Sequence, residues 1–198
     1  MPPLSSPPPE GRRTSKGARR SPETEAAILA AARDLLTDRG YSGFSIDEVA
    51  RRAGAGKPTI YRWWPTKADL FIAVYGMEKD ATLSQPDEAN LQEDLVHLTR
   101  DLWLFWRDHP AGSAFRGLIA EAQTGQGALE ALRDKFLPPR LDLLRHVFDK
   151  AVARGEIPAT GIEERIALWV GFSWYNLLIG IGSIDEEHIR RAMGLVAA

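Results

Sequence analysis

Residues 57–67 carry the side chains best suited to binding a partner. Lys57 and Arg62 can donate hydrogen bonds to guanine acceptors or to phosphates, and the methyl group of Thr59 can contact a thymine methyl group. Neighbouring polar groups can bind phosphate oxygens, which fix register and add affinity without reading base sequence. This mixture predicts contact with double-stranded DNA, through the candidate set Ser45, Lys57, Pro58, Thr59, Tyr61, Arg62, Trp63 and Lys67.

Residues that could carry catalysis do not cluster. The four histidines are far apart and none has the spacing of metal ligands: His97, His109, His146 and His188. No phosphate-binding glycine loop and no nucleophile motif appears. We therefore expect no catalytic residues, no metal and no cofactor, and a protein that is not an enzyme.

The charge is divided unevenly along the chain. Residues 1–67 carry 12 Lys or Arg against seven Asp or Glu, whereas residues 68–198 carry 13 against 20. A basic head on an acidic body indicates an anionic partner at one end, although a basic disordered tail on a neutral protein would give the same numbers. The chain has no cysteine and no apolar signal segment, which predicts a cytoplasmic protein.

Two short helices position the candidate DNA contacts. Ser45 and Glu48 have the spacing of a capping box, so a helix should begin at residue 46 and end at Gly54. A second helix is expected over 57–63, with Pro65 ending it, and Thr66 to Asp69 repeats the capping pattern for the helix that follows. In such a helix-turn-helix the second helix lies in the major groove, and its first residues face the bases.

Nearly all the rest of the chain has helical periodicity. Long helices are expected after the linker at 85–87, over 129–154 with a kink or break at Pro138-Pro139, and over 163–181 and 185–196. The sequence predicts an all-α protein of about nine helices, with an N-terminal three-helix helix-turn-helix domain and a C-terminal helical bundle. We expect a disordered basic tail over 1–20, a DNA-binding domain over 21–80, and a ligand-binding and dimerisation domain over 81–198.

The N-terminal half closely resembles one known family. Residues 23–75 are similar to the N-terminal domain of TetR-family regulators, through the blocks ILAAA at 28–32, GY at 40–41, FSIDEVA at 44–50, AGA at 53–55 and PTIYRWWPTKADL at 58–70. The resemblance implies an all-helical homodimer that usually represses transcription. It also implies a four-helix interface made by the last two helices of each subunit, and a C-terminal pocket for an inducer.

The segment 163–181 is apolar nearly all round, which agrees with a helix covered by a second subunit. A core helix of a monomer is the alternative. A membrane span is disfavoured, because the uncharged stretch over 167–184 is only 18 residues long and rich in Gly, Ser and Asn. The expected dimer interface consists of Trp169, Phe172, Leu177, Leu178, Ile181, Ile189 and Met193.

An aromatic excess in the C-terminal half predicts a pocket for a small hydrophobic effector, although plain core packing is the favoured interpretation of any single ring. Two or three of the candidates should line it, and these are Trp103, Trp106, Phe115, His146, Trp169, Trp174, Tyr175 and Asn176.

The expected mechanism is a pair of linked equilibria. The recognition helices of the dimer would stand about 34–36 Å apart on a palindromic operator, and an effector that prefers another spacing would weaken DNA binding. Two other hypotheses stay open: a helical small-molecule binding protein or enzyme with an incidental basic head, and a regulator controlled by a protein partner. Repression and activation are both compatible with the sequence.

Overall fold

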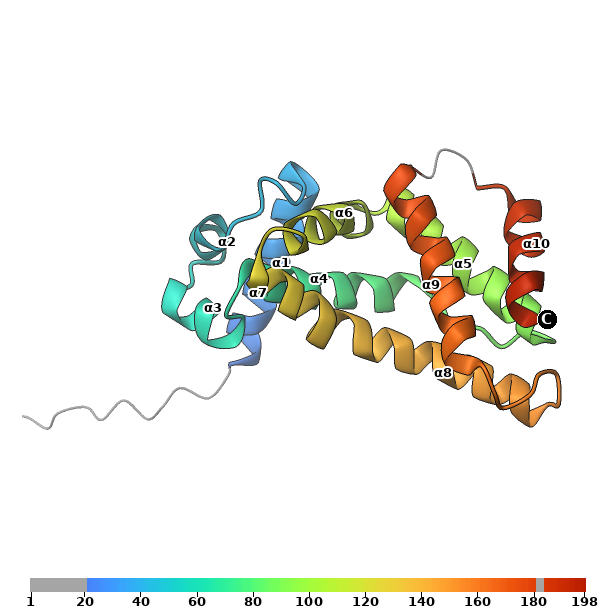
Figure 1. Ribbon diagram of the computed structural model, residues 1–198. Coiled ribbons are helices and arrows are strands. Elements are labelled where there is room, and N and C mark those ends of the chain that lie inside the picture. Colours follow the sequence, from blue (N-terminus) through green and yellow to red (C-terminus); the bar gives the residue numbers. More distant parts are fainter. Residues whose placement is uncertain (1–20, 181–183) are drawn as a thin grey trace, which may run out of the picture.

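The computed structural model describes residues 21–180 and 184–198, which form helices and connecting loops without strands (Figure 1). The predicted tail over 1–20 and the candidate interface residue Ile181 lie outside these ranges. The elements are α1 (Pro22–Arg39), α2 (Ile46–Ala53), α3 (Lys57–Trp63), α4 (Lys67–Thr82), α5 (Leu91–Asp108), α6 (Pro110–Ala122), α7 (Gln126–Ala131), the π-helical segment η1 (Leu132–Phe136), α8 (Leu137–Ala153), α9 (Ile162–Ile179) and α10 (Glu186–Ala197). Because α7, η1 and α8 follow one another without a loop, the described residues hold nine continuous helical runs, as predicted.

The helix-turn-helix forms where the capping residues placed it. The Ser45 hydroxyl accepts the backbone N–H of Glu48 at the start of α2, and Gly54 ends that helix with φ 61°, a left-handed conformation that glycine adopts without strain. Pro58 lies in the first turn of α3, where the missing N–H has no intrahelical partner to lose. Ile60 and Val49 are fully buried and hold the two helices on the core of the domain.

Helix α4 is the central element of the molecule. It packs on α1 on one side and on α6, α7 and η1 on the other, so the core is continuous from the helix-turn-helix to the C-terminal bundle. An aromatic cluster centred on Tyr75 forms this junction, with the rings of Phe71, Phe105, Phe115 and Phe136 between 5.1 and 5.9 Å from it.

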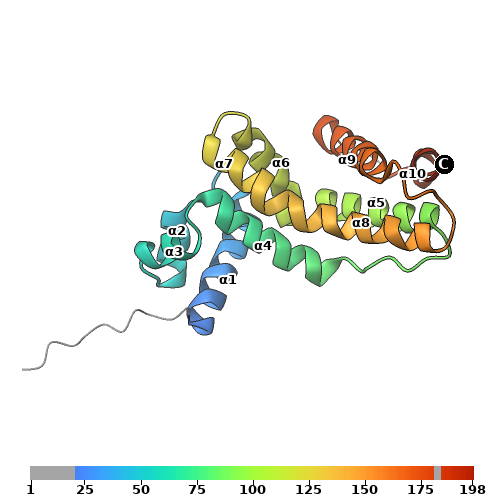
Figure 2. The ribbon, with the colours of Figure 1, turned by 60° about the horizontal axis from the view of Figure 1, so that its bottom comes forward.

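The expected interruption at Pro138-Pro139 takes the form of a π-helical turn rather than a break. Both prolines lie in the first turn of α8, where their missing N–H groups cost least, and η1 directly before them absorbs the change in hydrogen-bond register. The run from α7 to α8 therefore extends along α4 and α5 as one rod (Figure 2).

Helices α9 and α10 form a layer at the end of the molecule away from α1–α3 (Figure 2). Helix α10 packs mainly on α5, and α9 packs on α5, α8 and α10. Among the described residues no helix is both long and apolar enough to cross a bilayer.

Candidate DNA interface and effector cavity

One face of α3 is open to solvent. Lys57, Pro58, Tyr61 and Arg62 are exposed, and they recur at the one- and four-residue spacings that place side chains on one side of a helix. Thr59 is half-buried between them and the fully buried Ile60. Trp63 ends the same helix, so six of the eight predicted contact residues lie on α3, with apolar packing behind it.

Two predicted contacts are held by carboxylates in the free protein. The Lys57 ammonium group lies 2.8 Å from Asp47 of α2, and both side chains are more than half exposed. Lys67 lies 3.3 Å from Glu121 of α6 and 4.0 Å from the centre of the Tyr41 ring. Lys67 therefore links the helix-turn-helix to α6, a position that sequence alone did not indicate.

Ser45 and Trp63 have structural contacts as well. The Ser45 hydroxyl caps α2, although its side chain is exposed. The ring of Trp63 is half-buried and packs edge-on against the buried Trp64, with the Arg62 guanidinium group 5.7 Å from its centre. Packing of this kind orients Arg62 along α3.

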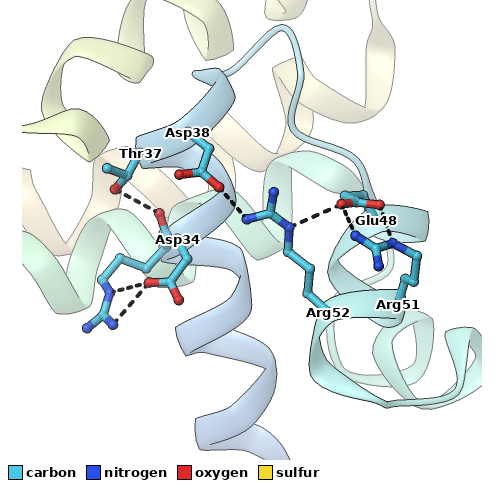
Figure 3. Close-up of polar contacts among 7 residues, drawn as sticks. Asp34, Thr37, Asp38, Glu48, Arg51 and Arg52 are labelled. Carbon is cyan, nitrogen blue, oxygen red and sulfur yellow. Dashed lines mark hydrogen bonds and ion pairs between the residues drawn. The ribbon is translucent and has the colours of Figure 1, made fainter.

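An ionic cluster fixes α2 against α1 (Figure 3). Arg52 donates to Asp38 of α1 at 2.7 Å and to Glu48 at 3.1 Å, while Arg51 binds the same Glu48 carboxylate with two hydrogen bonds. These bonds lower the pKa of Glu48 to about 2. They also explain a correction to the predicted capping box: Ser45 caps Glu48, but the Glu48 carboxylate turns to the two arginines rather than back to Ser45.

A partly open, largely apolar cavity lies between α4, α5, α8 and α9. Its free volume is about 80 Å³, and its wall includes the rings of Tyr75, Trp106, Phe136, Trp169 and Trp174 together with leucines of α5 and α8. The Trp106 indole donates to the Tyr75 hydroxyl at 2.9 Å, and burial raises the pKa of Tyr75 to about 12. Two cations, Lys79 and Arg140, complete the lining.

Three of the eight predicted pocket residues line this cavity: Trp106, Trp169 and Trp174. Phe115 lies behind it, stacked on Phe136 at 4.5 Å, and Trp103 is stacked on Phe172 at 5.3 Å. His146 and Tyr175 are exposed because their positions on α8 and α9 point to solvent, and Asn176 donates to the Phe172 carbonyl within its own helix. The structure does not bring these five to the cavity.

Sequence reasoning missed Tyr75, Phe136 and Arg140. Tyr75 and Phe136 follow the apolar periodicity of their segments, so they looked like ordinary core residues. Arg140 follows two prolines and carried no signal of burial. Only the packing of η1 on α4, with Arg140 one turn further along the same helical run, makes these three residues neighbours.

The predicted interface residues divide between two sides of the last helices. Trp169, Leu177, Ile189 and Met193 are buried within their own subunit, and Phe172 is half-buried. Leu178 is 54% exposed, and it belongs to a stripe of exposed apolar residues along α9 that sequence reasoning largely missed: Leu168, Tyr175, Leu178 and Ile179. Leu195 of α10 is exposed as well. Which side of α9 faced the core could not be read from a segment that is apolar all round.

A buried carboxylate joins α4 to the π-helical segment. Asp69, 6% exposed, completes the predicted capping box by accepting from the backbone N–H of Thr66, whose hydroxyl accepts from the N–H of Asp69. The other Asp69 oxygen lies 2.6 Å from the Lys135 ammonium group. The residue after Lys135 is Phe136 in the cavity wall, so Lys135 connects the cavity wall to the cap of α4, which follows α3.

Comparison with known proteins agrees with this arrangement. Residues 28–74 match the model of bacterial regulatory proteins of the tetR family, and residues 85–196 match a tetracyclin repressor-like C-terminal domain. An uncharacterized HTH-type transcriptional regulator of Bacillus subtilis, YdeS, is 30% identical over 178 residues, 89% of each chain. The DNA-binding transcriptional repressor TetR of Mycobacteroides abscessus is 33% identical over 133 residues, 66% of this chain and 69% of the relative.

The fold agrees as well. The crystal structure of the TetR family transcription regulator SCO0332 superposes with a TM-score of 0.76 at 27% identity, over 88% of this chain and 97% of that one. The predicted fold class and the predicted DNA-binding regulatory function are thereby confirmed. The names of the family and of these relatives indicate a regulator of transcription rather than an enzyme. The chain belongs to the TetR family of transcriptional regulators.

Proposed function

We propose that the protein is a homodimeric repressor that binds a palindromic operator through α3 and releases it when a small molecule enters the cavity. The observation that carries the DNA-binding part is the exposed face of α3, with two cations, a hydroxyl and a proline ring in front of a fully buried Ile60. One side of the helix is fixed by the packing of Ile60, and the opposite side is open to solvent, which a helix that enters the major groove requires.

Each exposed residue of this face has a role in the proposal. Lys57 and Arg62 donate to guanine or phosphate oxygens, and Thr59 and Pro58 contact thymine methyl groups. Tyr61, 48% exposed, and the N-terminus of α2 at Ser45 bind the phosphate backbone. Lys67 contributes by holding α4 against α6 through Glu121.

The proposed dimer uses the exposed stripe of α9 and the exposed Leu195 of α10. Leu168, Tyr175 and Ile179 are each more than 60% exposed and recur at four- and seven-residue spacing, with Gly171 among them and open space beside its α-carbon. Monomeric proteins rarely leave such a contiguous apolar stripe in water. A second copy of the same stripe would cover it, as a two-fold interface requires.

The proposed link between effector and DNA runs through η1. A ligand that displaces Phe136 moves the neighbouring Lys135, whose bond to Asp69 bears on the cap of α4 and so on the turn after α3. Single π-helical turns within α-helices are frequently found at functional sites. The effector weakens DNA binding by its differential affinity for the two arrangements.

Selection of bound fragments from random duplex DNA tests the proposal. The wild type is compared with the double variant Lys57→Ala/Thr59→Ala and with the matched surface control Arg191→Ala of α10, whose side chain is 62% exposed. The wild type and the control should recover one palindrome, and the double variant should lose it. Weak binding without sequence preference by all three proteins would contradict a base-reading role for α3.

A further inference from the structure

The cavity holds a cation that the fold does not neutralise. Its lining contains Lys79 and Arg140 and no carboxylate among the described residues. Lys79 has a neighbour for its charge, since its ammonium group lies 3.1 Å from Asp80. Arg140 has no carboxylate within ion-pair distance in the part of the chain that the structure describes, and burial lowers the pKa of its guanidinium group.

The guanidinium group is held by its faces and by one of its nitrogens. It lies 3.7 Å from the centre of the Phe136 ring and 5.0 Å from that of Tyr75, and its Nη1 donates to the Phe136 carbonyl at 2.6 Å. These contacts fix the plane of the group. They leave its Nε–H, which is shielded from solvent, without a hydrogen-bond partner among the described residues.

A buried N–H donor on a charged group is costly when it stays unpaired, because it has lost water and gained nothing in return. The planar fork of an arginine matches two oxygens of a carboxylate, and the Nε edge is one of the edges that can present it. Tyr75 adds a second donor: its hydroxyl oxygen already accepts from Trp106, and burial keeps its proton bound at neutral pH. The Arg140 Nε–H and the Tyr75 hydroxyl together suit an anionic hydrogen-bond acceptor.

The rest of the lining is apolar, so the part of a ligand that contacts it should be apolar as well. Three tryptophans, Phe136 and leucines of α5 and α8 surround the two donors. The free volume of about 80 Å³ has room for only a few water molecules, whereas ligand pockets usually measure about 300–1,000 Å³. A ligand must therefore push side chains apart, and Phe136 beneath Arg140 is in its way.

Resting on the proposed effector response, we propose that the effector is an amphipathic carboxylate, whose acid group binds Arg140 and whose apolar chain or ring lies among Trp106, Trp169 and Trp174. The entry route follows the seam between α4 and α8, where Arg140 and Lys79 also border an open, more polar groove. The carboxylate then meets a cation at the mouth and a hydrophobic wall behind it.

Matched acids and amides test the proposal on the full-length protein without DNA. Decanoate and 4-phenylbutyrate, each against its primary amide, are titrated by calorimetry into the wild type and into Arg140→Leu, Arg140→Gln and Arg133→Leu. Arg133 is the control because it lies on the same continuous helical run, in η1, is 61% exposed and pairs with its neighbour Asp134. Operator binding by each variant is measured in parallel, which shows that the variant is folded.

At least one acid should bind the wild type and Arg133→Leu about tenfold to hundredfold more tightly than its amide, the usual worth of a charged hydrogen bond. Both Arg140 variants should bind the acid and the amide alike. Equal affinity for acid and amide in the wild type, a preference for the acid that survives in Arg140→Leu, or no binding of either acid would overturn the proposal. If an acid binds through Arg140 but leaves operator affinity unchanged, the carboxylate site stands and the proposed effector response fails.

Discussion

Most cations of the helix-turn-helix have an acidic neighbour in the free protein. Lys57 pairs with Asp47, Arg52 with Asp38 and Glu48, and Lys67 with Glu121. The residue types that suit DNA could be predicted from the sequence, but these pairings could not, because three of the four join different helices. Pairing lowers the positive charge that the free protein presents to phosphates. DNA must displace these carboxylates from the cations, so they also influence the affinity for DNA.

Asp47→Asn should strengthen DNA binding and make it more salt-dependent. The change removes an exposed negative charge 2.8 Å from the Lys57 ammonium group and frees that cation for a phosphate. One added phosphate contact steepens the slope of log affinity against log salt by about 0.9. Fluorescence anisotropy at several salt concentrations measures the slope. Asp142→Asn of α8 is the control, because it removes one of the two carboxylates that pair with Arg145 at the other end of the molecule. An identical steepening there would contradict a local effect.

Thr99 supports the cavity wall through a buried hydrogen bond. Its hydroxyl, fully buried, accepts from the Trp169 indole at 2.9 Å and donates to the Leu95 carbonyl. Thr99→Val keeps the shape and leaves the indole N–H unpaired, which should lower the free energy of unfolding by about 1–3 kcal/mol in urea denaturation. Thr37→Val removes a similar bond to the Arg33 carbonyl at an exposed position and should cost much less. Equal losses in the two variants would show that the indole does not depend on Thr99.

At the scale of elements, the sequence predicted where the capped helices α2 and α4 begin better than it predicted the partners of their capping residues. The uncapped run expected from residue 129 begins at Gln126 instead. Thr66 and Asp69 form the complete capping box, whereas the Glu48 carboxylate binds two arginines instead of the Ser45 backbone N–H. Local spacing decides where a helix begins, since the free N–H groups need an acceptor there. The partner of the Glu48 carboxylate depends on Arg51 and Arg52 in the next turn of α2, and Arg52 is itself held by Asp38 of α1. Local spacing does not contain that information.

Glu48 makes the joint between α1 and α2 sensitive to acid. Its pKa is about 2 in the folded protein, below the ordinary value of about 4.3, so the unfolded chain takes up the proton first. The contribution of the cluster to stability is complete above about pH 4.5 and is lost as the pH falls towards 2. Arg52→Met should raise the pKa of Glu48, measured from its carboxyl carbon by NMR. Glu48→Gln should flatten the stability curve between pH 4.5 and 2, and an unchanged curve would contradict this assignment.

At the scale of the whole molecule, the sequence predicted that α9 is covered on all sides but not which side faces inward. Trp169 and Leu177 face the core, and Leu168 and Ile179 face solvent. The cavity escaped prediction for a similar reason. Its wall joins Tyr75, Trp106, Arg140 and Trp169 from four helices, and their meeting depends on long-range packing.

Leu168→Glu should convert the proposed dimer to monomers. The side chain is 62% exposed in one subunit and would be buried by a second copy, so a charge there would lose its water without gaining a partner. Sedimentation equilibrium should show a dimer dissociation constant at least about 100-fold higher than that of the wild type. Operator affinity should fall as the dimer is lost. Leu129→Glu of α7, at a 38% exposed leucine away from the stripe, should leave the mass unchanged. A dimer that persists in Leu168→Glu would place the interface elsewhere.

The joint between Lys135 and Asp69 offers a way to separate binding from response. Lys135→Met removes the 2.6 Å contact between η1 and α4 but leaves the Thr66 capping bonds of Asp69 and every residue of the cavity wall in place. The acid selected by the calorimetric titrations should therefore bind the free variant within about twofold of the wild type. Its power to weaken operator binding should fall by about 2–30-fold, the range found when one residue of a coupled pair of sites is changed.

The matched control is Arg133→Met, two residues away on the same π-helical segment, where the guanidinium group pairs only with its neighbour Asp134 among the described residues. Full coupling in Lys135→Met would show that the signal bypasses this joint, for example through the aromatic contact of Phe136 with Tyr75 of α4. Loss of coupling in both variants would instead implicate the π-helical turn itself. The three outcomes distinguish an ionic link, a packing link and a backbone link between the same two sites.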